Sequence, residues 1–186
     1  MGHPFSYQGV DRQLIEGKLM PNRIIKSIAR KSSIQLTDCL SSLFALELLS
    51  PSRALYLFSP WLSDVLLLHN SFGQFRAIIP ELSENDLRLA DLLNILAERG
   101  TLARIVCRPD QPHTEDFLRK LSSSIKVKQV ETLHEKGLVS EHFYLRGSMN
   151  FTFSGIHLND EHVELTTEPH QVALALAEAQ QRWETL

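Results

Sequence analysis

"LHEKGLVSEHFYLRGSMNFT" (residues 133–152) contains two short apolar runs separated by a polar turn at Glu141. Short apolar runs bounded by turn residues are typical of strands, so we expect strands over residues 136–140 and 142–146. Only antiparallel strands can be joined by so short a connection. The stretch therefore predicts at least one antiparallel strand pair in the sheet of this protein.

Outside this pair, the chain alternates between strand-like and helix-like segments. Such alternation is typical of an α/β domain, in which helices flank a mainly parallel or mixed sheet. With the antiparallel pair included, the expected fold is a mixed sheet flanked by helices. Strands are expected over residues 54–60, 75–81, 101–109, 125–131 and 160–167, and helices over residues 84–100, 114–124 and 169–185.

The first fifty residues have a different character. Residues 23–33 are basic and helix-like, and residues 37–50 are apolar enough to form a packed helix. We interpret residues 1–50 as an N-terminal helical extension packed on a main domain of residues 51–186. Residues 1–33 hold six Lys and Arg against two acids, which indicates either a solvated helix face or a surface that contacts a phosphate backbone.

Composition limits the class of protein. The 186 residues carry a net charge of −3 at pH 7, which argues against a protein that coats nucleic acid over its whole surface. Cys39 and Cys107 both have apolar neighbours, so we expect two reduced, buried thiols and no disulfide scaffold. The sequence starts without a signal peptide, and its most apolar stretch, residues 54–68, is interrupted by polar residues. These features predict a cytoplasmic protein with no membrane segment.

Polar residues stand at both outer ends of the predicted strand pair. His134 and Lys136 are two apart, and side chains two apart in a strand point to the same face. A lysine can offset the charge of a phosphate, and a neutral imidazole can attack its phosphorus. Gly147-Ser148-x-Asn150 follows the second strand, where glycine lets the backbone approach an anion and the polar side chains can donate to phosphate oxygens. Together they predict a phosphate site at one sheet edge.

A third polar pair, Asn159 and Glu161, opens the next expected strand and again shares one face. A carboxylate beside a catalytic imidazole fixes the tautomer of the ring and stabilises its cation. Glu161, with Asn159 beside it, is therefore a candidate for orienting His134.

In chain order these residues form the pattern H-x-K-x4-E-x5-G-S-x-N, followed by N-x-E. The pattern resembles the signature of the phospholipase D superfamily, H-x-K-x4-D-x6-G-S-x-N, and the resemblance covers about residues 51–186. It implies the phospholipase D-like α/β/α sandwich. The chain departs from the signature at Glu141, which replaces an Asp, and in the five residues before Gly147, where the family has six. In the family this acid is mostly structural and is turned away from the substrate.

The resemblance also implies an activity. Members of the superfamily cleave phosphodiesters without a metal or other cofactor, because one histidine attacks phosphorus to form a phosphohistidine and a second, facing histidine protonates the leaving group. By this resemblance the expected catalytic residues are His134, Lys136 and Glu161, and the expected phosphate-binding residues are Lys136, Ser148, Asn150 and Asn159.

Only one H-x-K motif occurs in the chain, so we expect a homodimer in which two His134 rings face each other across a twofold axis. Small single-motif bacterial members lean towards nucleases, and the sequence is similar to the phospholipase D-like component of bacterial gene clusters for 7-deazaguanine modification of DNA. The resemblance implies a DNA nuclease of a defence, restriction or DNA-modification system, acting with other subunits of that system. The alternatives are a non-catalytic DNA-binding or scaffolding subunit and a lipid phosphodiesterase.

Two further features have competing interpretations. Trp61 could pack in the core or in a dimer interface, or it could stack on a base. His142, His157 and His162 are fifteen and five residues apart, which matches no compact metal-ligand pattern, so no metal site is expected.

Overall fold

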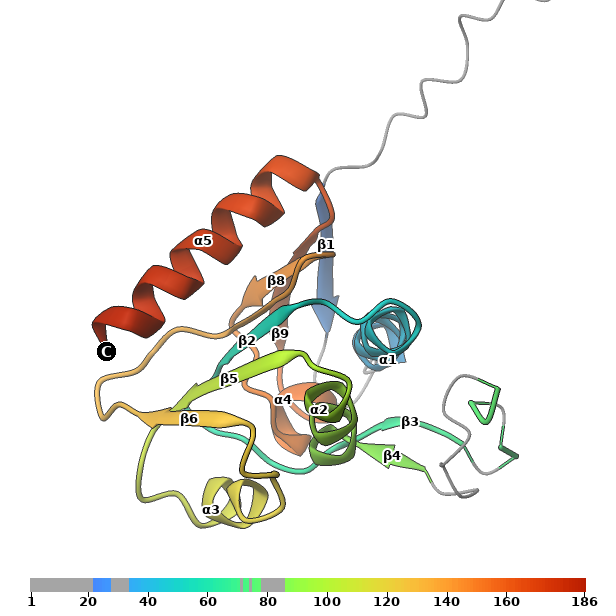
Figure 1. The fold of residues 1–186 in the computed structure, drawn as a ribbon, viewed down its shortest axis with the longest axis horizontal. Coiled ribbons are helices and arrows are strands. Elements are labelled where there is room, and N and C mark those ends of the chain that lie inside the picture. Colours follow the sequence, from blue (N-terminus) through green and yellow to red (C-terminus); the bar gives the residue numbers. More distant parts are fainter. Residues whose placement is uncertain (1–21, 28–33, 71, 74, 78–85) are drawn as a thin grey trace, which may run out of the picture.

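A seven-stranded mixed sheet forms the centre of the computed structural model, which describes residues 22–27, 34–70, 72–73, 75–77 and 86–186. The strands lie in the order β1-β9-β8-β7-β2-β5-β6 (Figure 1), and a second, two-stranded sheet pairs β3 with β4. The strands are β1 (Asn22–Ser27), β2 (Ala54–Phe58), β3 (Leu66–Leu68), β4 (Leu87–Arg88), β5 (Leu102–Cys107), β6 (Lys126–Gln129), β7 (Gly137–Val139), β8 (Tyr144–Gly147) and β9 (Glu161–Thr166).

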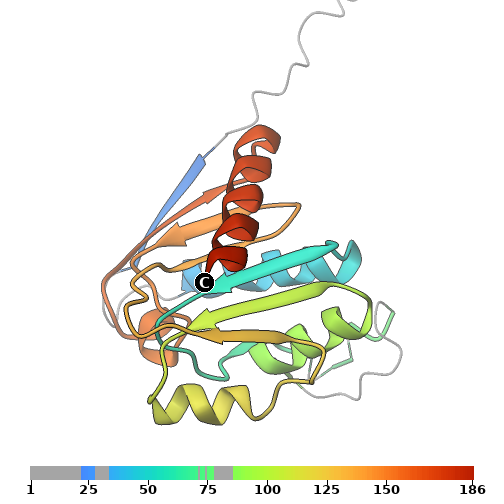
Figure 2. The same cartoon turned by 60° about the vertical axis from the view of Figure 1, so that its left-hand side comes forward.

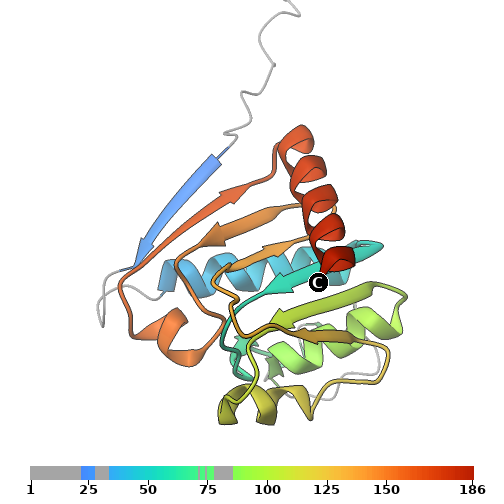
Figure 3. The ribbon, with the colours of Figure 1, turned by 90° about the vertical axis from the view of Figure 1, so that its left-hand side faces the viewer.

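Helices cover both faces of the large sheet. The C-terminal helix α5 lies across one face and contacts β2, β7 and β8, while α1 and α2 pack on the opposite face (Figures 2 and 3). This arrangement confirms the predicted α/β/α sandwich with a mixed sheet. No described helix is long and apolar enough to cross a membrane. The helices are α1 (Ile34–Leu49), α2 (Leu89–Glu98), α3 (Pro112–Leu118), α4 (Phe153–His157) and α5 (Pro169–Thr185).

Two groups of buried apolar side chains hold these layers together. The larger group joins the sheet to α1 and α2 and includes Leu40, Leu57 and Ile105, each with no exposed surface. The smaller group lies on the other face, where Phe58 of β2 and Ala175 of α5 belong to one buried cluster. Burying a side chain such as leucine or phenylalanine stabilises a fold by roughly 1.5–3 kcal/mol. Both faces of the sheet are therefore held to their helices by apolar packing.

The directions of the strands gather particular strand ends at one edge of the sheet. β2, β5 and β6 run parallel, whereas β7 pairs antiparallel with β2 on one side and with β8 on the other. β9 is antiparallel to β8, and β1 is antiparallel to β9. The carboxyl ends of β1, β2, β5 and β8 therefore meet the amino ends of β7 and β9. The antiparallel pairing of β7 with β8 confirms the strand pair predicted around Glu141.

The N-terminal segment differs from its predicted form. The sequence predicts a helix over residues 23–33, but Asn22–Ser27 form the edge strand β1, so this prediction is wrong; residues 28–33 lie outside the described part. β-branched side chains such as Ile24 and Ile25 favour strands, and β9 provides the backbone partners, with Ile25 opposite Val163. β1 and α1 thus share a sheet and a core with later elements, and the boundary at residue 50 stays a prediction.

Several smaller features also bear on the sequence predictions. Of the strand expected over residues 75–81, residues 75–77 form a turn and residues 78–81 lie outside the described part. The short elements α4, β3 and β4 were not predicted, because two to five residues are too few to show a periodic pattern. Both cysteines are free and buried, as predicted, and burial raises the pKa of the Cys107 thiol to about 12.

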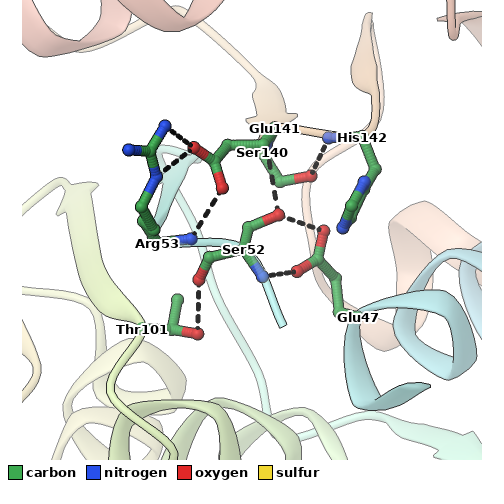
Figure 4. A network of polar contacts seen from close by, with 7 residues as sticks. All are labelled: Glu47, Ser52, Arg53, Thr101, Ser140, Glu141 and His142. Carbon is green, nitrogen blue, oxygen red and sulfur yellow. Dashed lines mark hydrogen bonds and ion pairs between the residues drawn. The ribbon is translucent and has the colours of Figure 1, made fainter. Parts of the chain in front are cut away.

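A polar network ties the turn between β7 and β8 to the start of β2 (Figure 4). The carboxylate of Glu141 accepts hydrogen bonds from the backbone N–H and the Nε of Arg53, at 2.9 and 2.7 Å. The buried carboxylate of Glu47, on α1, accepts from the backbone N–H and the hydroxyl of Ser52, both at 3.0 Å. The Ser52 hydroxyl also accepts from the backbone N–H of Glu141 at 3.2 Å. Glu141 therefore anchors the hairpin at the end remote from the H-x-K residues.

The network predicts that the contribution of Glu141 to stability depends on pH. Its hydrogen bonds with Arg53 hold the pKa of the Glu141 carboxyl below its usual value. A lowered pKa stabilises the folded state above the pKa of the unfolded chain, and this stabilisation is lost as the pH falls through the lowered pKa. We expect the melting temperature of Glu141→Gln to lie slightly below that of the wild type at pH 7, with the difference closing on acidification.

Thermal unfolding of both proteins across an acid pH series measures this difference, and Glu98→Gln, at an exposed position on α2, is the control that should match the wild type at each pH. A difference for Glu141→Gln that stayed constant down to the most acid pH would contradict the assigned role of the carboxylate.

Candidate active site

The predicted site residues gather at the one edge of the sheet where these strand ends meet. Ligands of open α/β sheets bind at such edges, because the loops that leave neighbouring strands converge there. The residues come from three segments of the chain that are separated in sequence. His134 and Lys136 directly precede β7, Ser148 and Asn150 follow β8, and Asn159 and Glu161 stand at the start of β9.

His134 is exposed and is contacted by two cationic side chains. A terminal guanidinium nitrogen of Arg108 lies 2.9 Å from Nε2 and 3.3 Å from Nδ1 of the ring. The Nε of Arg108 donates to the carbonyl oxygen of Leu133 at 2.7 Å, and the Nζ of Lys136 donates to that of His134 at 2.9 Å. Within the described part of the chain, neither Arg108 nor Lys136 forms an ion pair with an acid. The surroundings of His134 are therefore suited to an anion.

Glu161 is buried and joins the segments on both sides of it. Its carboxylate accepts hydrogen bonds from the hydroxyl of Ser148 and, at 3.3 Å, from the amide of Asn159. Its backbone N–H donates at 3.2 Å to the hydroxyl of Ser27, at the end of β1. Among the described residues no hydrogen bond joins Glu161 to the ring of His134, so the orienting role of this carboxylate stays a prediction.

Gly147 allows β8 and β9 to approach closely beside the site. Its φ of +154° is a backbone conformation that residues other than glycine rarely adopt. A Cβ at this position would lie 2.1 Å from the carbonyl oxygen of His162. That same carbonyl accepts from the backbone N–H of Ser148 at 3.0 Å, and the Ser148 hydroxyl accepts from the N–H of His162 at 3.0 Å. Gly147 therefore sets the position of Ser148.

Asn150 lies deeper than the rest of the motif, with 9% of its surface exposed. Its side-chain oxygen is buried and has no hydrogen-bond partner among the described residues. Its backbone oxygen accepts from the N–H of Thr152 at 2.8 Å, and Gly155 packs so closely against that oxygen that a Cβ there would lie 2.2 Å away. An unsatisfied buried acceptor is uncommon in folded proteins and is expected where a ligand or a water supplies the donor.

An open hollow of about 450 Å³ lies over this edge. Its two acids are both paired, since Glu164 binds Arg146 at 2.8 Å and Glu135 binds Arg182 at 2.7 Å. Burial raises the pKa of Glu135, although the charge of Arg182 acts in the opposite direction. Of the lysine and arginine side chains that line the hollow, Lys136 therefore has no acidic partner among the described residues. The walls of the hollow include His134, Lys136, Tyr144, Arg146, His162 and Glu164.

A family model described as "Cardiolipin synthase, PLD-like domain" matches residues 66–183, well over half of the chain. The chain belongs to the phospholipase D-like family. The matched residues include the whole motif from His134 to Glu161. No curated protein matches the sequence.

Solved structures with a similar fold agree with this assignment. A phospholipase D family member, Nuc from Salmonella typhimurium, has a TM-score of 0.55 and 15% identity, over 88% of this chain and 95% of that one. NucT from Helicobacter pylori has a TM-score of 0.55 and 13% identity, with the same coverages of 88% and 95%. Polyphosphate kinase from Porphyromonas gingivalis has a TM-score of 0.52 and 13% identity, over 81% of this chain and 24% of that one. At such identities the similarity concerns the fold.

The candidate site also contains residues that the sequence does not predict. The predicted strand over residues 101–109 includes Arg108, but β5 ends at Cys107, so Arg108 directly follows the strand. A charged residue directly after a buried strand is a signal for a site at the sheet edge. The sequence predicts a helix at Ser27, so it gives no sign of the contact with the backbone of Glu161. The sequence presents His162 only as a possible metal ligand, whereas it lines the same hollow as His134.

The two features with competing interpretations are partly decided by the structure. Trp61 is 44% exposed just beyond the carboxyl end of β2, which rules out core packing and leaves a dimer interface or a base. His142 contacts the carbonyl oxygen of Ser50 at 2.7 Å, beside the hairpin turn at the opposite edge. In the described ranges, no three His, Cys, Asp or Glu side chains are grouped so that they could hold a metal ion.

Substitution of Gly147 tests how tightly the site depends on the close approach of β8 and β9. Gly147→Ala would place a Cβ against the His162 carbonyl and strain the backbone, so we expect a loss of about 2–5 kcal/mol in the free energy of unfolding. Urea denaturation measures this loss. Gly100→Ala is the matched control, because Gly100 also has a positive φ, +96°, but nothing lies within 4 Å of its Cβ position. Equal losses for the two variants would show that the contact with His162 is unimportant.

Proposed function

We propose that this chain is a metal-independent phosphodiesterase that cleaves DNA as a homodimer, in a bacterial defence, restriction or DNA-modification system. The observation that carries the proposal is that the H-x-K and G-S-x-N segments meet at one sheet edge, beside an open hollow lined by His134, Lys136 and Gly147. A phosphodiester needs a nucleophile and cationic donors at its non-bridging oxygens, and the hollow offers both.

In the proposed first step, a ring nitrogen of His134 attacks phosphorus, and the bond from phosphorus to the leaving oxygen breaks. Lys136, Ser148 and Asn150 bind the non-bridging oxygens and stabilise the negative charge that develops on them. In the free protein, Lys136 donates to a backbone carbonyl and the Ser148 hydroxyl to Glu161, so both donors would turn towards an entering phosphate. Glu161, with Asn159, would stabilise the imidazolium.

The leaving oxygen needs a proton, but the single H-x-K motif of the chain already provides the nucleophile. We propose that His134 of a second copy faces the nucleophile across a twofold axis and donates this proton. The same imidazole then removes a proton from a water, which attacks the phosphohistidine and breaks the nitrogen–phosphorus bond. Two histidines thus perform the acid, base and nucleophile roles without a metal.

The choice of DNA rests on the resemblance to small single-motif members of the superfamily, which lean towards nucleases. An open hollow suits a polymer, because a long chain can enter and leave along its length. Trp61, exposed at the same edge, is available to stack on a base.

The first test compares cleavage by the wild type and by His134→Ala. We expect the wild type to cleave labelled single- or double-stranded DNA in the presence of EDTA, because the chemistry requires no metal. His134→Ala should lose at least about 10³-fold in rate, since it removes both the nucleophile and the proton donor. Gel analysis of end-labelled oligonucleotides measures both effects.

His170→Ala is the matched control, because His170 is an exposed histidine in the first turn of α5, at the sheet edge opposite the motif. It should cleave as the wild type does. Cleavage that stops in EDTA, or that survives in His134→Ala, would exclude the mechanism. Tight DNA binding by both proteins with no cleavage would favour the alternative of a non-catalytic DNA-binding subunit.

The second test concerns the shared site. Sedimentation should give twice the 21.2-kDa mass of one chain. In an equimolar mixture of wild type and His134→Ala that has exchanged subunits fully, only dimers with two wild-type chains retain both histidines. The mixture should therefore keep about one quarter of the activity of undiluted wild type, because random pairing leaves that fraction intact. A value near one half would indicate that each chain works independently.

A further inference from the structure

Arg108 links the end of β5 to the segment that carries His134. Its backbone N–H donates to the carbonyl oxygen of Pro60 at 3.1 Å, so the residue is anchored to the loop after β2. Its Nε donates to the carbonyl oxygen of Leu133 at 2.7 Å, and one terminal nitrogen lies 2.9 Å from Nε2 of His134. The H-x-K and G-S-x-N pattern does not include this residue, and neither of these segments is adjacent to it in sequence.

The guanidinium of Arg108 retains unused capacity for an anion. A guanidinium carries five N–H donors in a planar fork and accepts no hydrogen bond. Two of its nitrogens contact Leu133 and His134, whereas the other terminal nitrogen has no hydrogen-bond partner among the described residues. The side chain is half-buried and forms no ion pair with an acid in that part of the chain. Arginine in such a setting is suited to binding phosphate with two parallel hydrogen bonds.

The contact with the ring leaves the lone pair of His134 free. The same terminal nitrogen of Arg108 lies 2.9 Å from Nε2 and 3.3 Å from Nδ1, so it lies over the ring and not on the in-plane axis of either nitrogen's lone pair. Attack on phosphorus uses that in-plane lone pair. A phosphate oxygen is a stronger acceptor for the guanidinium than the neutral ring, so an entering phosphate can replace the ring as its partner.

We propose that Arg108 is a second cationic phosphate-binding residue beside Lys136, which contacts the ring of His134 in the free protein and transfers to a non-bridging phosphate oxygen when substrate enters. This inference rests on the proposed phosphodiesterase function. The hydrogen bond from Nε to the Leu133 carbonyl can persist during the transfer, so only the contact between the terminal nitrogen and His134 has to be replaced.

The first arm of the test measures anion binding without catalysis. Inorganic phosphate is titrated into the full chain while the ring signals of His134 are followed by NMR, with His134→Ala used to identify them. We expect Arg108→Gln to weaken the apparent affinity for phosphate about 10-fold or more, because a charged hydrogen-bond donor is lost. Arg108→Lys keeps the charge without the planar fork and should be intermediate. The ring signals of Arg108→Gln should also differ from those of the wild type before phosphate is added.

Arg119→Gln is the matched control, because it removes the same charge from an exposed arginine at the end of α3, which pairs with Asp116. It should bind phosphate as the wild type does. Arg108 also binds the Leu133 carbonyl, so its loss could destabilise the fold, and urea denaturation is therefore measured for each variant. If Arg108→Gln does not fold, Arg108→Lys is compared with the wild type instead. If Arg108→Gln binds phosphate as tightly as the wild type, the inference is overturned. Where Arg108→Gln does not fold, the same result for Arg108→Lys overturns it.

The second arm measures hydrolysis of bis(p-nitrophenyl) phosphate, a simple phosphodiester. We expect kcat/KM of Arg108→Gln to fall about 10- to 100-fold, with partial recovery in Arg108→Lys. If the wild type hydrolyses the diester and Arg108→Gln does so equally well, the inference fails while the proposed function stands. If no form hydrolyses any phosphodiester, the proposed function fails, and the phosphate titration still decides whether Arg108 binds the anion.

Discussion

The antiparallel pairing of β7 with both β2 and β8 is the constraint on which the arrangement of the site depends. Because β7 runs against both neighbours, its amino end meets their carboxyl ends, and Lys136 comes to lie beside Gly147, whose backbone N–H faces the Lys136 carbonyl at 3.4 Å. Arg108 arrives at the same edge because β5 is parallel to β2. If β7 ran in the opposite direction, its leading residues would stand at the far edge, about 10 Å away along the strand.

Charged side chains have different partners at the two edges of the sheet. At the hairpin turn, Glu141 is paired with Arg53 and Glu47 is satisfied by Ser52, so these acids stabilise the fold and hold the hairpin in register. At the opposite edge, Arg108 and the Lys136 ammonium end on backbone carbonyls and a ring nitrogen. Unpaired charge costs stability, and proteins tend to keep it where a ligand of opposite charge will bind. The motif acid thus has a structural position, and the charge suited to an anion lies with the histidine.

Some elements can be predicted from a local sequence pattern, and others cannot. The strands around Glu141 and the long helix α5 were predicted because each has a local apolar pattern bounded by turn or cap residues. β1 was missed because it is an edge strand with only Ile25 and Ser27 buried, and its partner β9 is distant in sequence. Arg108 and Ser27 were missed at the site for the same reason, since each acts on a residue far along the chain.

By itself the sequence determined the fold class, the strand pair and the spacing of the motif, because apolar periodicity and turn chemistry are properties of neighbouring residues. Residue order also determined that one chain has a single H-x-K motif. Only the tertiary structure decided which groups contact His134 and how Glu161 is bonded to Ser148 and Asn159. It also decided that the side-chain oxygen of Asn150 is buried without a partner among the described residues. These contacts arise from strand order and direction, and pairing between distant segments leaves no local pattern in the sequence.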